Sequence, residues 1–215
     1  PTTITDLPYH AIKGNPPKYQ YNNLVMYSKY LYILIPFEEG FDIPPIFDHY
    51  ILNILKKNDN VHILLADINH DERVISSSSL SRCVLNKRLR SIMSIDKNDG
   101  SKSSSKNIIS ERRRIHHITG LSRSDYLSLV AVVNIVLDPV TDDGGGTERT
   151  ILPSLETLMI GTPIITLFPD EMKRGWNKVQ PTSSVAALIK SIGGNDITKH
   201  CVAINEIDYI QKVVL

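Results

Sequence analysis

The feature that most constrains the fold is residues 137–166, LDPVTDDGGGTERTILPSLETLMIGTPIIT. A short apolar run at 132–137 predicts a strand that leads into this segment. A glycine-rich stretch follows the strand and consists of Gly144, Gly145, Gly146 and Thr147. We expect a helix that opens at Ser154 with Glu156 in its first turn. A Gly-Thr-Pro turn then leads into a second strand at 164–167.

A strand, a glycine loop and a helix in this order suit an anionic ligand. Glycines allow close approach of the backbone, and a helix N-terminus offers unpaired N–H groups and the positive end of its dipole. The segment is therefore a candidate phosphate or nucleotide site. The alternative is a solvent loop without a ligand, because Asp142 and Asp143 precede the glycines.

Strand-like and helix-like segments alternate along the rest of the chain. Further strands are expected at 31–36, 61–66, 115–118 and 200–203. Helices are expected at 46–57, 80–95, 122–130, within 178–192 and at 205–215. This alternation predicts an α/β fold, a Rossmann-like parallel sheet flanked by helices with right-handed crossovers. In such a sheet ligands bind at the carboxyl ends of the strands.

The chain divides into a lead-in and one domain. Residues 1–30 show no clean periodicity and predict an irregular lead-in, and residues 31–215 form the Rossmann-like domain. A polar, serine- and lysine-rich insertion near 97–110 is expected to be disordered. Because the chain begins without methionine and ends within an amphipathic pattern, we interpret it as a fragment of a larger protein.

Composition excludes several classes of function. Hydrophobic residues make up 41% and charged residues 22% of the chain, which is typical of a soluble globular protein. The net charge of +1 favours neither nucleic acid nor a membrane surface as a partner, and no apolar run is long enough to span a membrane. Two cysteines, Cys83 and Cys201, form neither a disulfide framework nor a metal pattern, which favours a cytoplasmic or nuclear setting.

The histidines do not predict a metal site. His116 and His117 are adjacent in a predicted strand, so their side chains point to opposite faces, and we expect one packed and one exposed. No cysteine or carboxylate is placed to complete a ligand set with them. His200 is expected at the start of a buried strand as a structural residue.

The order of these segments resembles a known family. The run RIHHITGLSRSDYLSLVAVVNIVLDP at 114–139, followed by GGGT and SLETLMIGTPIIT, resembles the carboxy-terminal catalytic half of the O-GlcNAc transferase family, including its bacterial and protist relatives. The resemblance implies the nucleotide-sugar-binding half of a GT-B glycosyltransferase. It implies UDP-GlcNAc as substrate, no cofactor, and inverting transfer of the sugar to Ser, Thr or Asn of a protein acceptor. The acceptor-side catalytic groups, an amino-terminal catalytic domain and tetratricopeptide repeats are then expected outside this chain.

The resemblance also implies roles for individual residues. The loop Gly144, Gly145, Gly146 and Thr147 corresponds to the diphosphate loop, and Ser154 is the hydroxyl nearest to the family's threonine pair at the helix start. Glu156 corresponds to an acidic residue that faces the ribose, or is a first-turn charge that complements the helix dipole. Arg123 and Tyr126 correspond to residues near the uridine, or decorate the helix surface. Glu39 falls in the loop after the first strand, where the family has glutamine.

Two departures from the family pattern leave the activity open. Asp42 stands where the family has a lysine that binds the diphosphate, and two carboxylates beside a diphosphate would repel it. Residues 148–153 are inserted between the glycines and the helix. The alternatives to an active transferase are a catalytically impaired GT-B scaffold or binding module, and a GT-B enzyme that uses another nucleotide sugar.

Overall fold

A parallel β-sheet forms the centre of the molecule. The computed structural model describes residues 17–21, 24–38, 43–68, 87–89, 91, 113–139, 151–168 and 184–214. The strands of the central sheet are β3 (Leu31–Glu38), β4 (Val61–Ile68), β5 (Ile115–Leu121), β6 (Ile135–Leu137), β7 (Ile164–Leu167) and β8 (Val202–Ala203). All neighbouring pairs in this sheet are parallel, in the order β5-β4-β3-β6-β7-β8.

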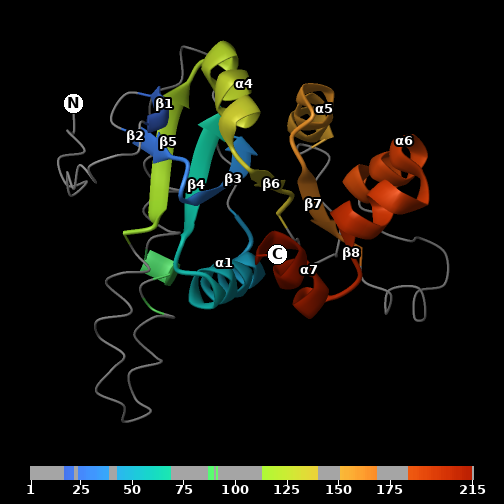
Figure 1. Ribbon diagram of the computed structural model, residues 1–215. Coiled ribbons are helices and arrows are strands. Elements are labelled where there is room, and N and C mark those ends of the chain that lie inside the picture. Colours follow the sequence, from blue (N-terminus) through green and yellow to red (C-terminus); the bar gives the residue numbers. More distant parts are fainter. Residues whose placement is uncertain are drawn as a thin grey trace, which may run out of the picture.

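Helices connect the strands and cover both faces of the sheet (Figure 1). They are α1 (Pro45–Lys57), α4 (Arg123–Val132), α5 (Ile151–Ile160), α6 (Ser184–Cys201) and α7 (Glu206–Val214). One helix each lies between β3 and β4, β5 and β6, β6 and β7, and β7 and β8. The predicted α/β fold with a parallel sheet flanked by helices is confirmed.

The strand order has a single reversal, and it lies at the centre of the sheet. From β3 the chain moves outward through β4 to β5, then returns to the other side of β3 as β6 and continues outward through β7 to β8. This is the doubly wound Rossmann order. In sheets of this order, ligands commonly bind at the reversal, outside the carboxyl ends of the strands.

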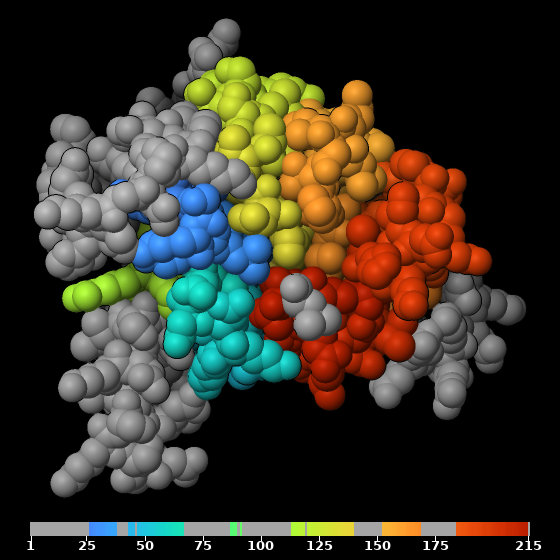
Figure 2. Space-filling model, in the orientation of Figure 1, coloured from blue at the N-terminus to red at the C-terminus, as the bar shows by residue number. Residues whose placement is uncertain are grey.

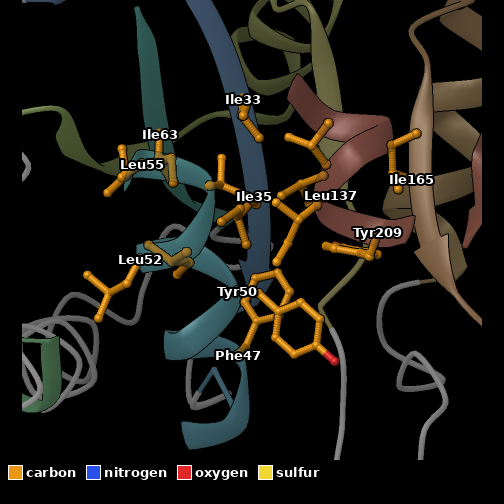
Figure 3. Close-up of a cluster of buried hydrophobic side chains, with 14 of the residues drawn as sticks. Ile33, Ile35, Phe47, Tyr50, Leu52, Leu55, Ile63, Leu137, Ile165 and Tyr209 are labelled. Carbon is orange, nitrogen blue, oxygen red and sulfur yellow. The ribbon is translucent and has the colours of Figure 1, made fainter. Parts of the chain in front are cut away.

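The sheet separates two hydrophobic layers. Side chains alternate along β3, so that Ile33, Ile35 and Phe37 enter the layer with α1 and α7, whereas Tyr32 and Leu34 enter the layer with α4 and α6. In the α1–α7 layer the two helices pack side by side, although they come from opposite halves of the sequence (Figure 1). Figure 3 shows aromatic side chains from both helices in one cluster with aliphatic residues of the sheet.

Part of the predicted lead-in is ordered. The strands β1 (Pro17–Tyr21) and β2 (Leu24–Tyr27) form an antiparallel hairpin. Met26 is fully buried in the α4–α6 layer, and the Tyr27 N–H donates to the Tyr32 hydroxyl at 3.0 Å. The tyrosine-rich composition of 17–27 is compatible with strands, because aromatic residues pack well on a half-buried pleated surface.

From residue 31 onward, the predicted elements that the structure describes are correct in kind, but several boundaries are wrong. The strands predicted at 31–36, 61–66 and 115–118 extend further as β3, β4 and β5. β6 is shorter than the predicted strand at 132–137, because α4 continues through Val132. Apolar residues of a buried helix end and of a buried strand cannot be separated by periodicity alone.

The predicted end of α6 and the last strand also differ from the structure. We expected the helix to end within 178–192 and a strand at 200–203, but helical structure continues to Cys201 and β8 holds only Val202 and Ala203. The chain kinks at Gly194 (φ 60°, ψ −163°), after which a second helical segment follows. His200 is consequently an exposed residue of α6 and does not open a buried strand.

Only a short part of the helix predicted at 80–95 is described, and it contacts α1. Residues 87–89 are helical, and Arg88 donates to both carboxylate oxygens of Asp48 in α1, at 2.8 Å each. Arg88 also donates to the Ile43 carbonyl oxygen at 2.6 Å. The polar insertion near 97–110 lies outside the described residues.

Candidate functional site

The carboxyl ends of β3, β5 and β6 lie at one edge of the sheet. The described residues at this edge include Ser122, where α4 begins after β5, and Asp138, which follows β6. Of the predicted site residues, Arg123, Tyr126, Ser154 and Glu156 are described. Several predicted or related positions lie outside the described residues: Glu39, Asp42, Gly144, Gly145, Gly146 and Thr147.

Two predicted site residues from different helices meet as an ion pair. Nη2 of Arg123, the first residue of α4, donates to Oε1 of Glu156 in α5. The Arg123 side chain is 52% exposed, whereas Glu156 is only 11% exposed. Figure 2 shows that the surfaces of α4 and α5 adjoin. The guanidinium of Arg123 is therefore accessible from solvent, and the more buried carboxylate of Glu156 pairs with it.

Tyr126 lies beneath this ion pair. It is one turn after Arg123 in α4 and is fully buried in the α4–α6 layer, so its ring has no exposed face for a base to stack on. The geometry gives its hydroxyl no hydrogen bond among the described residues. Burial raises the pKa of Tyr126, and contact with Thr157 offsets only part of this rise. The phenol is consequently neutral at physiological pH.

Ser154 does not lie at the start of a helix. α5 begins at Ile151, three residues earlier than expected, so the end of the inserted segment 148–153 forms its first turn. Pro153 is accommodated there because first-turn N–H groups need no intrahelical acceptor. Ser154 is 2% exposed, and Glu156 lies beyond the first turn, which contains no acidic residue. The alternative role of Glu156 as a first-turn dipole charge is thus not supported.

The N-terminus of α4 is capped by its own residues. The Asp125 N–H donates to the Ser122 hydroxyl oxygen at 3.2 Å, and that hydroxyl donates to the Asp125 carboxylate at 2.6 Å. Ser122 is therefore the N-cap residue of α4. An acidic side chain at this terminus disfavours an anionic ligand there.

A buried polar network at the exit of β6 was not predicted as a unit. The Thr166 hydroxyl of β7 donates to Oδ2 of Asp138 at 2.8 Å, and the Tyr209 hydroxyl of α7 donates to the Asp138 carbonyl oxygen at 3.1 Å. All three residues are buried. Burial and the neighbouring Asp138 raise the pKa of Tyr209. The sequence signals for this network were a threonine within the otherwise apolar strand β7 and an aspartate directly after β6.

The histidines form a pair at the opposite edge of the sheet. Nδ1 of His62 in β4 lies 2.9 Å from Nε2 of His116 in β5, and both side chains are partly buried. His117 is also partly buried, so the expectation that one of the adjacent histidines is exposed is wrong. Within the described ranges, no three His, Cys, Asp or Glu side chains are grouped to hold a metal ion.

Comparisons with known proteins identify the fold. No family model and no curated protein matches the chain. Among solved structures, the K341M mutant of the O-GlcNAc transferase of Thermobaculum terrenum matches with a TM-score of 0.50 at 16% identity, over 86% of this chain and 28% of that chain. A UDP-forming α,α-trehalose-phosphate synthase from Burkholderia vietnamiensis matches with a TM-score of 0.46 at 9% identity, over 86% of this chain and 35% of that chain.

The class of domain follows from the strand order and this likeness. The chain has the Rossmann-like α/β fold found in GT-B glycosyltransferases, and it spans 28% of the O-GlcNAc transferase it resembles. None of the described helices combines the length and apolarity needed to cross a bilayer.

Proposed function

We propose that this chain is the nucleotide-sugar-binding domain of a glycosyltransferase, with UDP-GlcNAc as the sugar donor and a protein Ser, Thr or Asn side chain as the acceptor. The single observation that carries the proposal is the Arg123–Glu156 pair at the carboxyl edge of a doubly wound sheet. In such sheets the crevice at the topological switch point is the preferred site for nucleotides. The segments that leave β3 and β6 at this point contain Glu39 and the glycine loop 144–147.

In this proposal the domain stabilises the leaving group. Transfer displaces UDP from the anomeric carbon, so negative charge grows on the diphosphate, and fixed donors that face this charge lower the barrier. Backbone N–H groups of the glycine loop and of the first turn of α5 supply these donors. Glu156 accepts hydrogen bonds from the ribose hydroxyls, and Arg123 donates to a base carbonyl or to a phosphate.

Two of the predicted site residues are buried and are therefore excluded from direct contact with the ligand. Tyr126 and Ser154 are buried, so in this proposal they pack inside the protein and do not touch the ligand. The proposed contacts are therefore the Arg123–Glu156 pair, the glycine loop and the start of α5.

Titration of UDP into the folded chain, followed by calorimetry, tests the proposal. We expect binding that Glu156→Gln weakens at least five-fold, because an amide is a poorer acceptor for a diol and no longer holds Arg123. Asp208→Asn is the matched control, since Asp208 also pairs with a cation, Lys212, but within α7. Absence of UDP binding at millimolar concentration in a folded sample would refute the proposal.

A substitution at Asp42 gives a second test, in which UDP binding should become tighter. Replacing Asp42 by lysine removes one negative charge and adds a positive charge where the family resemblance has its diphosphate-binding lysine. We expect tighter UDP binding, because unlike charges near the diphosphate replace like charges. An unchanged affinity would favour the scaffold alternative over a weakened transferase site.

A further inference from the structure

α4 and α5 lie side by side (Figure 1), and the described contacts join them near both ends of α4. The first contact is the Arg123–Glu156 ion pair, at the first residue of α4. The second is a hydrogen bond at 2.7 Å, in which the Thr162 hydroxyl, from the turn after α5, donates to the Val130 carbonyl oxygen. Arg123 and Val130 are about two helical turns apart, or roughly 10 Å along the axis of α4. Contacts at this spacing determine both the distance and the angle between the two helices.

The Val130 carbonyl oxygen can accept from Thr162 because it lies in the last turn of α4. The N–H group that would reach it in a longer helix, that of Asn134, donates to a carbonyl oxygen of β3 at 3.0 Å instead. Thr162 is buried, so this hydrogen bond is shielded from water. Thr162 is also joined to α5, because its N–H donates to the Thr157 carbonyl oxygen at 3.2 Å. It therefore connects the end of α4 to the residue next to Glu156.

The ion pair alone is too exposed to fix this arrangement. The Arg123 side chain is 52% exposed, and water competes with such a pair, so the pair contributes little to stability. A buried hydrogen bond is costlier to break, because its groups cannot turn to water. Tyr126 of α4 and Thr157 of α5 are also in contact, and both are fully buried. The buried part of the interface therefore determines where Glu156 lies relative to Arg123.

We infer that Thr162 is a positioning residue for the nucleotide site: it holds α5 against α4 and so sets the position of the Glu156 carboxylate relative to the Arg123 guanidinium. This inference rests on the proposed function, in which these two groups contact the nucleotide. Thr162 is buried, so it acts on the ligand only through the pair. Because binding groups must be held within about 0.5 Å of their productive positions, loss of the Thr162 hydrogen bond should weaken binding.

Two substitutions at this one residue separate the effect of its hydroxyl from that of its shape. Thr162→Val removes the hydroxyl and keeps the branched side chain. The following Pro163 favours an extended backbone at position 162, which valine adopts readily. Thr162→Ser keeps the hydroxyl and serves as the conservative rescue. Ile189→Val controls for a general loss of stability, because Ile189 is buried in the α4–α6 layer but belongs to α6.

We expect Thr162→Val to weaken UDP binding at least three-fold in calorimetry, whereas Thr162→Ser and Ile189→Val bind like the unchanged protein. The loss should disappear when Thr162→Val is combined with Glu156→Gln, because the pair through which Thr162 acts is then already broken. An equal loss in both backgrounds, or no loss in either, would overturn the inference. A failure of Thr162→Ser to restore binding would overturn it as well.

The ion pair can also be followed without a ligand. The side-chain nitrogen NMR signals of Arg123, assigned by their loss in Arg123→Lys, report whether the guanidinium is paired. In Thr162→Val they should move toward their positions in Glu156→Gln, where no carboxylate is available, and they should stay unchanged in Thr162→Ser. If the unchanged protein does not bind UDP, the proposed function fails, and these signals still decide whether Thr162 positions the pair. Unchanged Arg123 signals in Thr162→Val would show that Thr162 is only structural.

Discussion

His62 and His116 are kept neutral by their surroundings. The pKa of His62 is lowered to about 3, mainly by burial and then by His116, Arg114 and Lys29. Burial lowers the pKa of His116 to about 4. The two rings are nearly parallel, with an interplanar angle of 11°, and their nitrogens are close enough to share one proton. Tyr30 and Tyr32 pack against His62 and exclude water from it.

This pair predicts an acid-sensitive stability. Both pKa values lie below that of an unfolded histidine, so the unfolded chain binds protons first and stability falls as the pH drops below about 6.5 toward 4. At pH 5 we expect a loss of about 1–2 kcal/mol per histidine in urea denaturation. His116→Gln should flatten this pH dependence, whereas His200→Gln, at an exposed position, should leave it intact; equal slopes in both variants would contradict the prediction.

The end of α5 shows how a local sequence signal determines a turn. Gly161 has a φ of 89°, the Thr162 N–H donates to the Thr157 carbonyl oxygen at 3.2 Å, and the Gly161 N–H donates to that of Leu158 at 3.1 Å. These are the two hydrogen bonds of a Schellman motif. The Gly-Thr-Pro turn was predictable because this backbone conformation favours glycine and needs no distant partner.

Substitution of Gly161 should therefore be costly for a purely backbone reason. No atom lies within 4 Å of a Cβ built at this position, so steric overlap is absent and only the positive φ opposes a side chain. We expect Gly161→Ala to lower the free energy of unfolding by about 1–2 kcal/mol. Asparagine tolerates this conformation better, so Gly161→Asn should cost less in the same urea denaturation; the reverse order would show that backbone strain is not the cause.

The elements that the sequence predicted less well depend on tertiary contacts. α5 was expected to begin at Ser154 because serine is a common N-cap, yet the helix starts at Ile151 and buries Ser154. The Arg123–Glu156 pair joins residues 33 positions apart, and no local pattern indicates that α4 and α5 adjoin. The family resemblance placed both residues near one ligand, which is compatible with their contact in the structure.

The network at Asp138 illustrates the same limit on prediction. Its members are the residue after β6, a residue of β7 and a residue of α7, and the Tyr209 hydroxyl is 71 positions from the carbonyl oxygen it contacts. Periodicity assigns Tyr209 to the buried face of an amphipathic helix but does not give the partner of its hydroxyl. The kind and order of the described elements from β3 onward were predictable from local patterns. The β1–β2 hairpin and the contacts between distant segments required the structure.

The two halves of the sheet share one hydrophobic core. The cluster that contains α1 and β4 also contains α7, β7 and β8, so both halves of the sheet share it. α7 packs directly beside α1, and Asn53 of α1 donates to Glu206 of α7 at 3.1 Å (Figure 1). The two halves of the doubly wound sheet are therefore expected to unfold together and not as separate units.

A substitution in α7 should consequently destabilise strands on the other side of the sheet. Ile210 is 4% exposed in the shared core, whereas Ile207 in the same helix is 66% exposed. We expect Ile210→Ala to cost about 2–4 kcal/mol in a single transition, and Ile207→Ala to stay within about 0.5 kcal/mol of the unchanged protein. Amide exchange under native conditions should then be faster in β4 as well as in β8 for Ile210→Ala. If β8 alone loses protection, α7 stabilises only its own half of the sheet and the prediction is wrong.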